Sequence, residues 1–171
     1  MMEIDTKSPA KINLYLKILN KRKDGYHNIE TSFQYIDLYD FLNFKESKND
    51  ISIESNNPIF KNTNNTIFQA ASKMKEYLNS SSGVSIKIEK NIPMGSGLGG
   101  ASSNAASTIL ALNKLWGLGL SDKKLLNIGK EIGADVPFFI FGKNSLAKGI
   151  GEILENTESI KNNILVIDPQ I

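Results

Sequence analysis

The sequence of 171 residues contains no cysteine. Disulfide bonds, thiolate metal sites and a cysteine nucleophile are therefore excluded, and a reducing compartment is the expected location. Long apolar runs are missing too, because the longest, from Val136 to Phe141, is too short to cross a bilayer. The stretch from Met1 to Pro9 lacks the apolar core of a secretory signal. We therefore expect a cytoplasmic protein without a membrane partner.

An excess of charge of one sign is also missing. Lysine and arginine number 20, aspartate and glutamate number 18, and the net charge is +2. Such a balance gives no reason to expect nucleic acid as a partner. The shares of apolar and charged residues, 40% and 22%, are typical of a globular protein, and the length suits one domain or slightly more.

Alternation of apolar and polar residues predicts several strands. From Lys11 to Ile18, one expected face is apolar and comprises Ile12, Leu14, Leu16 and Ile18. Lys11 and Asn13 then project together from the other face. On the pattern alone, both are more simply explained as solvated side chains than as functional ones. Further strands are expected in these stretches, the first of them broken near Asp37 to Asp40: Ile29 to Phe44, Ile51 to Glu54, Gly83 to Glu89, Ser145 to Ile153, and Ile164 to Ile167.

Apolar residues at helical spacing predict three helices. The first begins at Thr66, with Gln69 completing a capping box. The second follows a glycine-rich turn that ends at Ser103, and the third runs from Ser121 to Ile132. Strands, a helix, a strand, two helices and further strands make a mixed α+β domain.

The glycine-rich stretch organises the chain, because it lies between a strand and the first turn of a helix. Its glycines allow positive φ angles and a close approach of the backbone to a ligand. The unpaired N–H groups at a helix start favour an anion, so this arrangement is typical of a phosphate site. A flexible turn capped by a serine is the alternative. The candidate phosphate-binding residues are Pro93, Met94, Gly95, Ser96, Gly97, Leu98, Gly99, Gly100, Ala101, Ser102 and Ser103.

Neither common nucleotide-binding fingerprint fits this stretch. A Walker A loop ends in Gly-Lys-Ser/Thr, whereas Ala101 follows Gly100 here. The spacing of Gly95, Gly97 and Gly100 matches that of a dinucleotide-binding turn. However, the acidic residue that such a turn requires about 20 residues further on is missing.

The local sequence does not decide whether two other residues, His27 and Asp135, have a functional or a structural role. His27, the only histidine, follows the Asp24-Gly25 turn signal. A lone histidine in a turn is more often exposed or capping than functional. Asp135 precedes the apolar run, where a charge is costly unless it is paired. A cap of a short helix and a functional carboxylate explain Asp135 equally well.

Four motifs, occurring in this order, resemble the GHMP kinase superfamily from about Ser8 to Leu154: Ser8-Pro-Ala-Lys-Ile-Asn13, Asp24-Gly-Tyr-His27, Pro93 to Ser103, and Gly133-Ala-Asp-Val-Pro137. The Asp-Gly-Tyr-His turn is similar to that of the members that phosphorylate the 2-hydroxyl of a cytidine-diphosphate-linked methylerythritol in the non-mevalonate route to isoprenoids. The resemblance implies an N-terminal domain of the ribosomal-S5 type that uses ATP and Mg²⁺.

The resemblance also implies roles for individual residues. Asp135 is the expected catalytic base and Lys11 its charged partner, and the two side chains should converge. Such a pair suits phosphoryl transfer, which needs mainly positioning and charge stabilisation. The glycine-rich stretch should hold the ATP phosphates, with Asn65 bordering the adenine; which serine binds the metal ion is left open. Three residues are expected to contact the cytidine-diphosphate substrate: Asn13, Tyr26 and His27.

Members of the superfamily continue into a second, ferredoxin-like domain. We therefore expect residues 1–160 to form the N-terminal ATP-binding domain. Residues 161–171 should begin the second domain, with Ile164 to Ile167 as its first strand and the rest missing. We expect the 171 residues alone to bind nucleotide weakly, with little or no turnover, and the sequence leaves the oligomeric state open.

Overall fold

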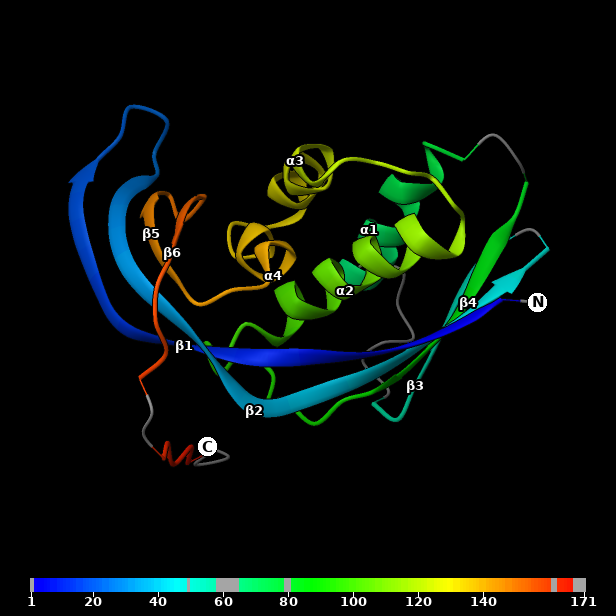
Figure 1. The fold of residues 1–171 in the computed structure, drawn as a ribbon, viewed down its shortest axis with the longest axis horizontal. Helices are drawn as coiled ribbons and strands as arrows, with labels where there is room; N and C mark the ends of the chain where they lie inside the picture. The colour runs from blue at the N-terminus through cyan, green and yellow to red at the C-terminus, as the bar shows by residue number, and fades with distance from the viewer. Residues whose placement is uncertain (1, 49, 58–64, 79–80, 161–162, 168–171) are drawn as a thin grey trace.

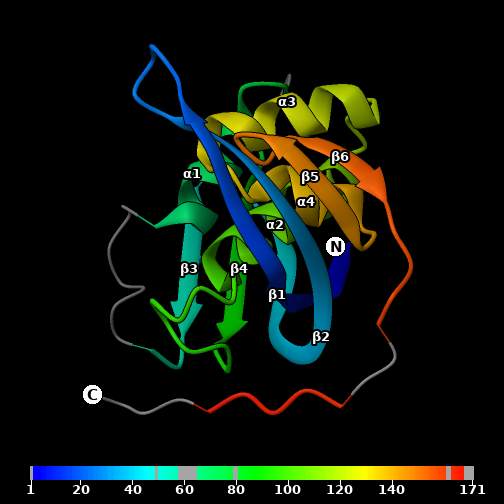
Figure 2. The same ribbon diagram turned by 90° about the vertical axis from the view of Figure 1, so that its left-hand side faces the viewer.

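The computed structural model describes residues 2–48, 50–57, 65–78, 81–160 and 163–167. Within them, helices α1 to α4 pack on one face of a single sheet, so the predicted α+β class is confirmed (Figure 1). The sheet has the order β3-β4-β2-β5-β6, with β1 also paired to β2 (Figure 2). Its strands are β1 (Glu3–Lys21), β2 (His27–Ser47), β3 (Ile51–Ser55), β4 (Gly83–Glu89), β5 (Ser145–Gly149) and β6 (Ile153–Asn156).

Strand β2 is the central strand of this sheet, because three other strands pair with it. It pairs with β1 along nearly its whole length, with β4 near its C-terminal end and with β5 near its N-terminal end, always antiparallel. β3 runs parallel to β4. The hairpin of β1 and β2 bends so that its tip curls toward the side of the helices (Figure 1). The predicted break near Asp37 to Asp40 is only a shift in pairing with β1, and β2 continues through it.

The predicted apolar face of β1 is wrong beyond Asn13. The pairing passes from Asn13 with Phe33 to Tyr15 with Ser32, so one extra residue of β1 bulges out there. Residues directly opposite in a sheet share a face, and a bulge moves the following residues to the other face. Leu16 and Ile18, paired with Thr31 and Ile29, therefore lie on the same face as Lys11 and Asn13. Both are largely exposed, at 55% and 61%.

The helices begin where local capping allows. Asn65 caps α1 (Thr66–Lys75), because its side-chain oxygen accepts a 2.9 Å bond from the Phe68 N–H. The predicted capping box starting at Thr66 is therefore wrong by one residue. The other helices are α2 (Gly100–Leu115), α3 (Asp122–Ile132) and α4 (Val136–Phe141). α3 follows Ser121 as predicted, whereas α2 begins at Gly100, three residues before the expected end of the glycine-rich turn. α4 contains the apolar run.

Aromatic packing fixes the short helix α4 on the sheet. The ring of Phe138 stacks on Tyr35 at 4.5 Å between centroids and also contacts Phe33 at 4.8 Å. The Tyr35 hydroxyl donates a 3.0 Å hydrogen bond to the Phe138 carbonyl, and burial raises the pKa of this phenol well above its usual range. The rings and the hydrogen bond together set the position of the residue that precedes α4, Asp135.

The segment after β6 does not form the strand that was predicted for Ile164 to Ile167. These residues have no regular structure and are exposed. All four residues are apolar and show no alternation, and no neighbouring strand pairs with them in the described part of the chain. Closer to β6, the Gln34 side chain pairs with the backbone of Ile160, accepting its N–H at 2.8 Å and donating to its carbonyl at 3.2 Å.

Gly129 lies at a close contact between α3 and α4. A Cβ there would lie 2.7 Å from Ile140 Cδ1 and 3.0 Å from Val136 Cγ1. Alanine is normally favoured over glycine in a helix by about 0.5–1 kcal/mol, but overpacking costs about 1–3 kcal/mol. We expect Gly129→Ala to lower the free energy of unfolding by about 1 kcal/mol in a urea titration. Asn127→Ala, exposed in the same helix, should not lower it, and a more stable Gly129→Ala protein would contradict the close packing.

Candidate functional site

Lys11 and Asp135 meet on the helix-covered side of the sheet. The Lys11 ammonium lies 3.4 Å from Asp135 Oδ2, which confirms that these two residues converge. Lys11 is 5% exposed, and its Nζ also donates a 2.6 Å hydrogen bond to Asn13 Oδ1. Asn13 in turn donates to the Thr31 hydroxyl at 2.8 Å. The buried ammonium is therefore surrounded by a carboxylate and an amide, as a buried charge requires.

Asp135 occupies the N-cap position of α4, but it does not act as a cap. Its side chain makes no hydrogen bond to the helix backbone, and about a third of it (32%) remains exposed. The structure therefore gives no support to the interpretation of Asp135 as a structural cap. A carboxylate that is accessible on one side and faces a lysine on the other can take a proton from a bound hydroxyl group.

The glycine-rich stretch forms a shallow cradle at the start of α2. Gly95, Gly97 and Gly99 all have φ angles between 72° and 75°, which is the conformation predicted for them. The cradle encloses about 220 Å³ and opens onto the N-terminal turn of α2, whose free N–H groups favour an anion. Its lining residues are Lys90, Pro93, Met94, Gly95, Ser96, Gly97, Gly99, Gly100, Ala101 and Ser102.

Contacts from two other elements hold the cradle in place. The Lys11 N–H donates to the Leu98 carbonyl at 2.9 Å, so the strand that carries the lysine is tied to the loop. The Thr66 hydroxyl donates to the Ala101 carbonyl at 2.9 Å, which ties in the start of α1. A Cβ on Gly99 would lie only 2.8 Å from Phe139 Cζ and 3.0 Å from Lys11 Cγ. The cradle and the Lys11–Asp135 pair are therefore in direct contact.

Some predicted phosphate-binding residues lie beside the cradle and do not line it. The Leu98 side chain packs with Ala10, Ile36 and Ile92 in a small apolar cluster. Ser103 is buried, and its N–H already bonds to the Gly99 carbonyl at 2.8 Å. Asn65 caps α1. Of the two serines at the helix start, only Ser102 reaches the cradle.

The predicted substrate residues are divided between two places. Asn13 contacts Lys11, whereas Tyr26 and His27 lie exposed at the tip of the β1–β2 hairpin. Within the described residues, no hydrogen bond or ion pair joins either of them to the Lys11–Asp135 pair. Alternation along β2 nevertheless places His27 on the same face as Thr31 and therefore as Asn13. One continuous face of the hairpin leads from the pair to His27.

Sequence reasoning missed Asp40 and Lys90. Asp40 shares the buried face of β2 with Leu42 and Phe44, is itself fully buried, and forms an ion pair with Lys90 next to the cradle. A charged residue at one of the alternating positions that core residues occupy in a strand is a sequence signal that could have identified Asp40.

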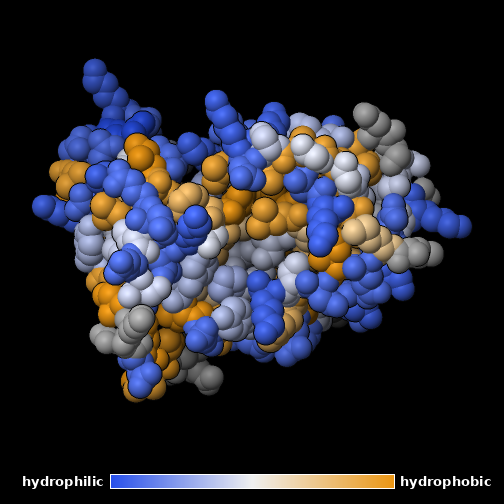
Figure 3. Space-filling model, in the orientation of Figure 1, coloured by the Kyte–Doolittle hydropathy of each residue, from blue (hydrophilic) through white to orange (hydrophobic). Residues whose placement is uncertain are grey.

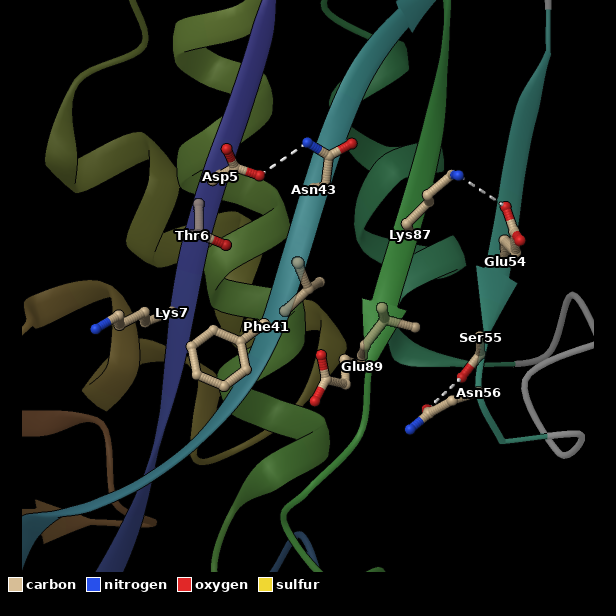
Figure 4. A pocket seen from close by; sticks show the side chains of 12 residues that line it. Asp5, Thr6, Lys7, Phe41, Asn43, Glu54, Ser55, Asn56, Lys87 and Glu89 are labelled. Atoms are coloured by element: carbon tan, nitrogen blue, oxygen red, sulfur yellow. Dashed lines mark hydrogen bonds and ion pairs between the residues drawn. The ribbon is translucent and has the colours of Figure 1, made fainter.

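Hollows larger than the cradle lie elsewhere. One of about 710 Å³ is on the sheet face opposite the helices, and most of its polar side chains pair with one another, such as Asn43 with Asp5 and Lys87 with Glu54 (Figure 4). On the face drawn in Figure 3, apolar surface lies in the upper middle of the molecule and again at its lower left, with hydrophilic surface around both.

The residues of the cradle and of the Lys11–Asp135 pair are better suited to binding phosphate than to holding a metal ion by themselves. Among the described residues, no group of three or more His, Cys, Asp or Glu side chains could hold a metal. Mg²⁺ would therefore depend mainly on phosphate oxygens and water for its ligands, with few from the protein. None of the helices in the described ranges is long and apolar enough to span a membrane.

A family model described as the GHMP kinases N terminal domain matches residues 65–143, which include α1, the cradle and α2 to α4. The matched residues and the fold are those of the N-terminal domain of the GHMP kinases. A mevalonate kinase from Methanococcus jannaschii shares the fold, with a TM-score of 0.64 at 18% identity.

The more similar relatives define a narrower group. Proteins named 4-diphosphocytidyl-2-C-methyl-D-erythritol kinase are 46% identical over 163 residues in Acinetobacter baumannii and 47% over 175 residues in Alkaliphilus oremlandii. These alignments cover 95% and 100% of this chain but only 58% and 60% of the two relatives. A crystal structure of 4-(cytidine 5'-diphospho)-2C-methyl-D-erythritol kinase matches with a TM-score of 0.75 at 36% identity, over 90% of this chain and 55% of that one.

Gly97 and Gly99 allow a matched test of the cradle. Both have a φ of +75°, but a Cβ would meet open space at Gly97 and would clash with Phe139 and Lys11 at Gly99. Alanine costs about 1–2 kcal/mol of strain at either position, and overpacking adds about 1–3 kcal/mol at Gly99 alone. We expect Gly99→Ala to lower the free energy of unfolding by at least about 1 kcal/mol more than Gly97→Ala. If urea unfolding showed equal decreases in the free energy of unfolding for the two variants, the loop would not pack closely on Lys11.

Proposed function

We propose that this chain provides the phosphate cradle and the catalytic pair of an ATP-dependent kinase. The acceptor is the 2-hydroxyl of 4-(cytidine 5'-diphospho)-2-C-methyl-D-erythritol, in the non-mevalonate route to isoprenoid precursors. The observation that carries the proposal is the contact between the two parts of the site, in which Gly99 packs on the side chain of Lys11 while Lys11 faces Asp135. The names of the relatives support the choice of substrate.

Each residue of the pair has a proposed task. ATP supplies the transferred phosphoryl group when it is bound. Asp135 takes the proton of the substrate hydroxyl as the oxygen–phosphorus bond forms, and ADP leaves with the electron pair of the broken bond. Lys11 stabilises the negative charge that develops on the attacking oxygen. Its bond to Asn13 fixes the direction of the ammonium, because the amide is itself held by Thr31.

The cradle contributes binding and electrostatic stabilisation. Backbone N–H groups at the start of the 16-residue helix α2 are the phosphate donors, and the Ser102 hydroxyl at its rim is available to a phosphate oxygen or to Mg²⁺. The missing side chains at Gly95 and Gly97 let phosphate groups approach the backbone.

The hairpin face is the proposed path of the cytidine diphosphate. His27 and Asn13 share this face, so the sugar alcohol would lie at the pair and the base near the hairpin tip. Tyr26, which is 59% exposed, offers an aromatic ring for stacking on the base.

The 171 residues alone are proposed to bind nucleotide without efficient turnover. The chain spans only 58% of the Acinetobacter relative, and the exposed Leu16 and Ile18 next to the hairpin path leave that side open to water. Water weakens charge stabilisation in a site. Nucleotide binding without efficient turnover stays a prediction, and so does the cytoplasmic location.

Substitutions in the full-length protein test the pair. Asp135→Asn removes the base but keeps a side chain of the same shape, so we expect kcat to fall at least about a hundredfold with little change in substrate affinity. Lys11→Ala should lower kcat by a similar factor. The assay couples ADP release to a spectroscopic readout, with the cytidine-diphosphate substrate and Mg²⁺-ATP. Asp122→Asn, on the exposed first turn of α3, serves as the control and should not change the rate.

These experiments test the catalytic role of Asp135 separately from the choice of substrate. Near-normal turnover of Asp135→Asn would return Asp135 to a structural role. Normal ATP binding without phosphorylation of the cytidine-diphosphate compound by the unsubstituted protein would contradict the proposed substrate and leave the cradle in place.

A further inference from the structure

Asp40 is a fully buried carboxylate in the middle of β2, outside the Lys11–Asp135 pair. Its Oδ1 accepts hydrogen bonds from the backbone N–H groups of Asn91 and Ile92, at 2.7 and 2.8 Å. Its Oδ2 accepts a 3.0 Å bond from the Asn104 side chain and forms an ion pair with Lys90. A buried charge with this many donors is fully compensated, so its position is strongly determined.

These contacts join the two ends of the cradle. Residues Lys90 to Ile92 lead directly into the glycine-rich stretch, and Asn104 lies in α2 just after it. One carboxylate therefore holds both the segment that enters the cradle and the helix that leaves it. The hydrogen bonds reach across 51 to 64 residues of sequence, so local structure alone does not provide this connection.

The same carboxylate also places a cation at the cradle. The Lys90 side chain lines the cradle, and its Nζ lies 3.2 Å from where a Cβ on Gly100 would be. The side chain is only 6% exposed, and its ammonium forms an ion pair with Asp40. A cation at the start of a helix adds to the attraction of the helix terminus for an anion.

We propose that Asp40 is a positioning residue for nucleotide binding, a role that rests on the function proposed above. Asp40 contacts no ligand itself. It acts by fixing the cradle backbone through Asn91 and Ile92, the start of α2 through Asn104, and the ammonium of Lys90. Removing its charge loosens these three elements together but removes no contact made by Lys11 or Asp135 themselves.

The test uses the full-length protein with Asp40→Asn, and calorimetry with a non-hydrolysable ATP analogue beside steady-state kinetics. We expect the dissociation constant of the analogue and the KM for ATP to rise about tenfold or more, whereas kcat changes by less than about threefold. Phe44→Leu, at a buried position of the same strand away from the cradle, is the matched control. It should lower the melting temperature without changing nucleotide affinity.

A second variant covers the case in which Asp40→Asn does not fold. Asn104→Ala removes one buried partner of Asp40 and does not line the cradle, so it should also raise the KM for ATP with little change in kcat. A lower melting temperature with unchanged nucleotide affinity in the folded variants would overturn the positioning role alone. Failure of the unsubstituted protein to bind the ATP analogue would overturn the proposed function and this inference with it.

Discussion

The site depends on the burial of one lysine ammonium. A charge that is almost removed from water is tolerated only when oxygen atoms surround it. Lys11 obtains them from Asp135, which precedes α4, and from Asn13 on its own strand. This requirement links the position of α4 to β1. The aromatic stacking of Phe138 and the close approach of Gly99 follow from the same arrangement, because both lie directly against these elements.

Local signals in the sequence predicted much of the fold and the cradle. Alternation identified β3 and β4, and helical spacing identified α1 to α3 within a few residues. The positive φ angles of three glycines followed from the lack of a side chain. The convergence of Lys11 with Asp135, by contrast, came from resemblance. Their separation in sequence is long, and a strand pattern alone favoured a solvated lysine.

Features that depend on the partner strand could not be predicted. The bulge at Leu14 arises from how β1 pairs with β2, and it moved Leu16 and Ile18 to the face of Lys11. Ile164 to Ile167 lacked a pairing strand among the described residues. Asp40 was overlooked because the alternation was used to find apolar residues, although its place in line with Leu42 and Phe44 was a signal of burial; the donors that surround its carboxylate become visible only in the fold.

The central claim is that Lys11 and Asp135 act as one unit next to the cradle. A double-mutant cycle on the single-turnover rate of the full-length protein tests it most directly, with Lys11→Ala, Asp135→Asn and the combined variant. Residues that act as a unit have strongly non-additive effects, so we predict that the combined variant is within about tenfold of Asp135→Asn alone. Losses that multiply, with the combined variant slower by the product of the two single effects, would contradict the claim.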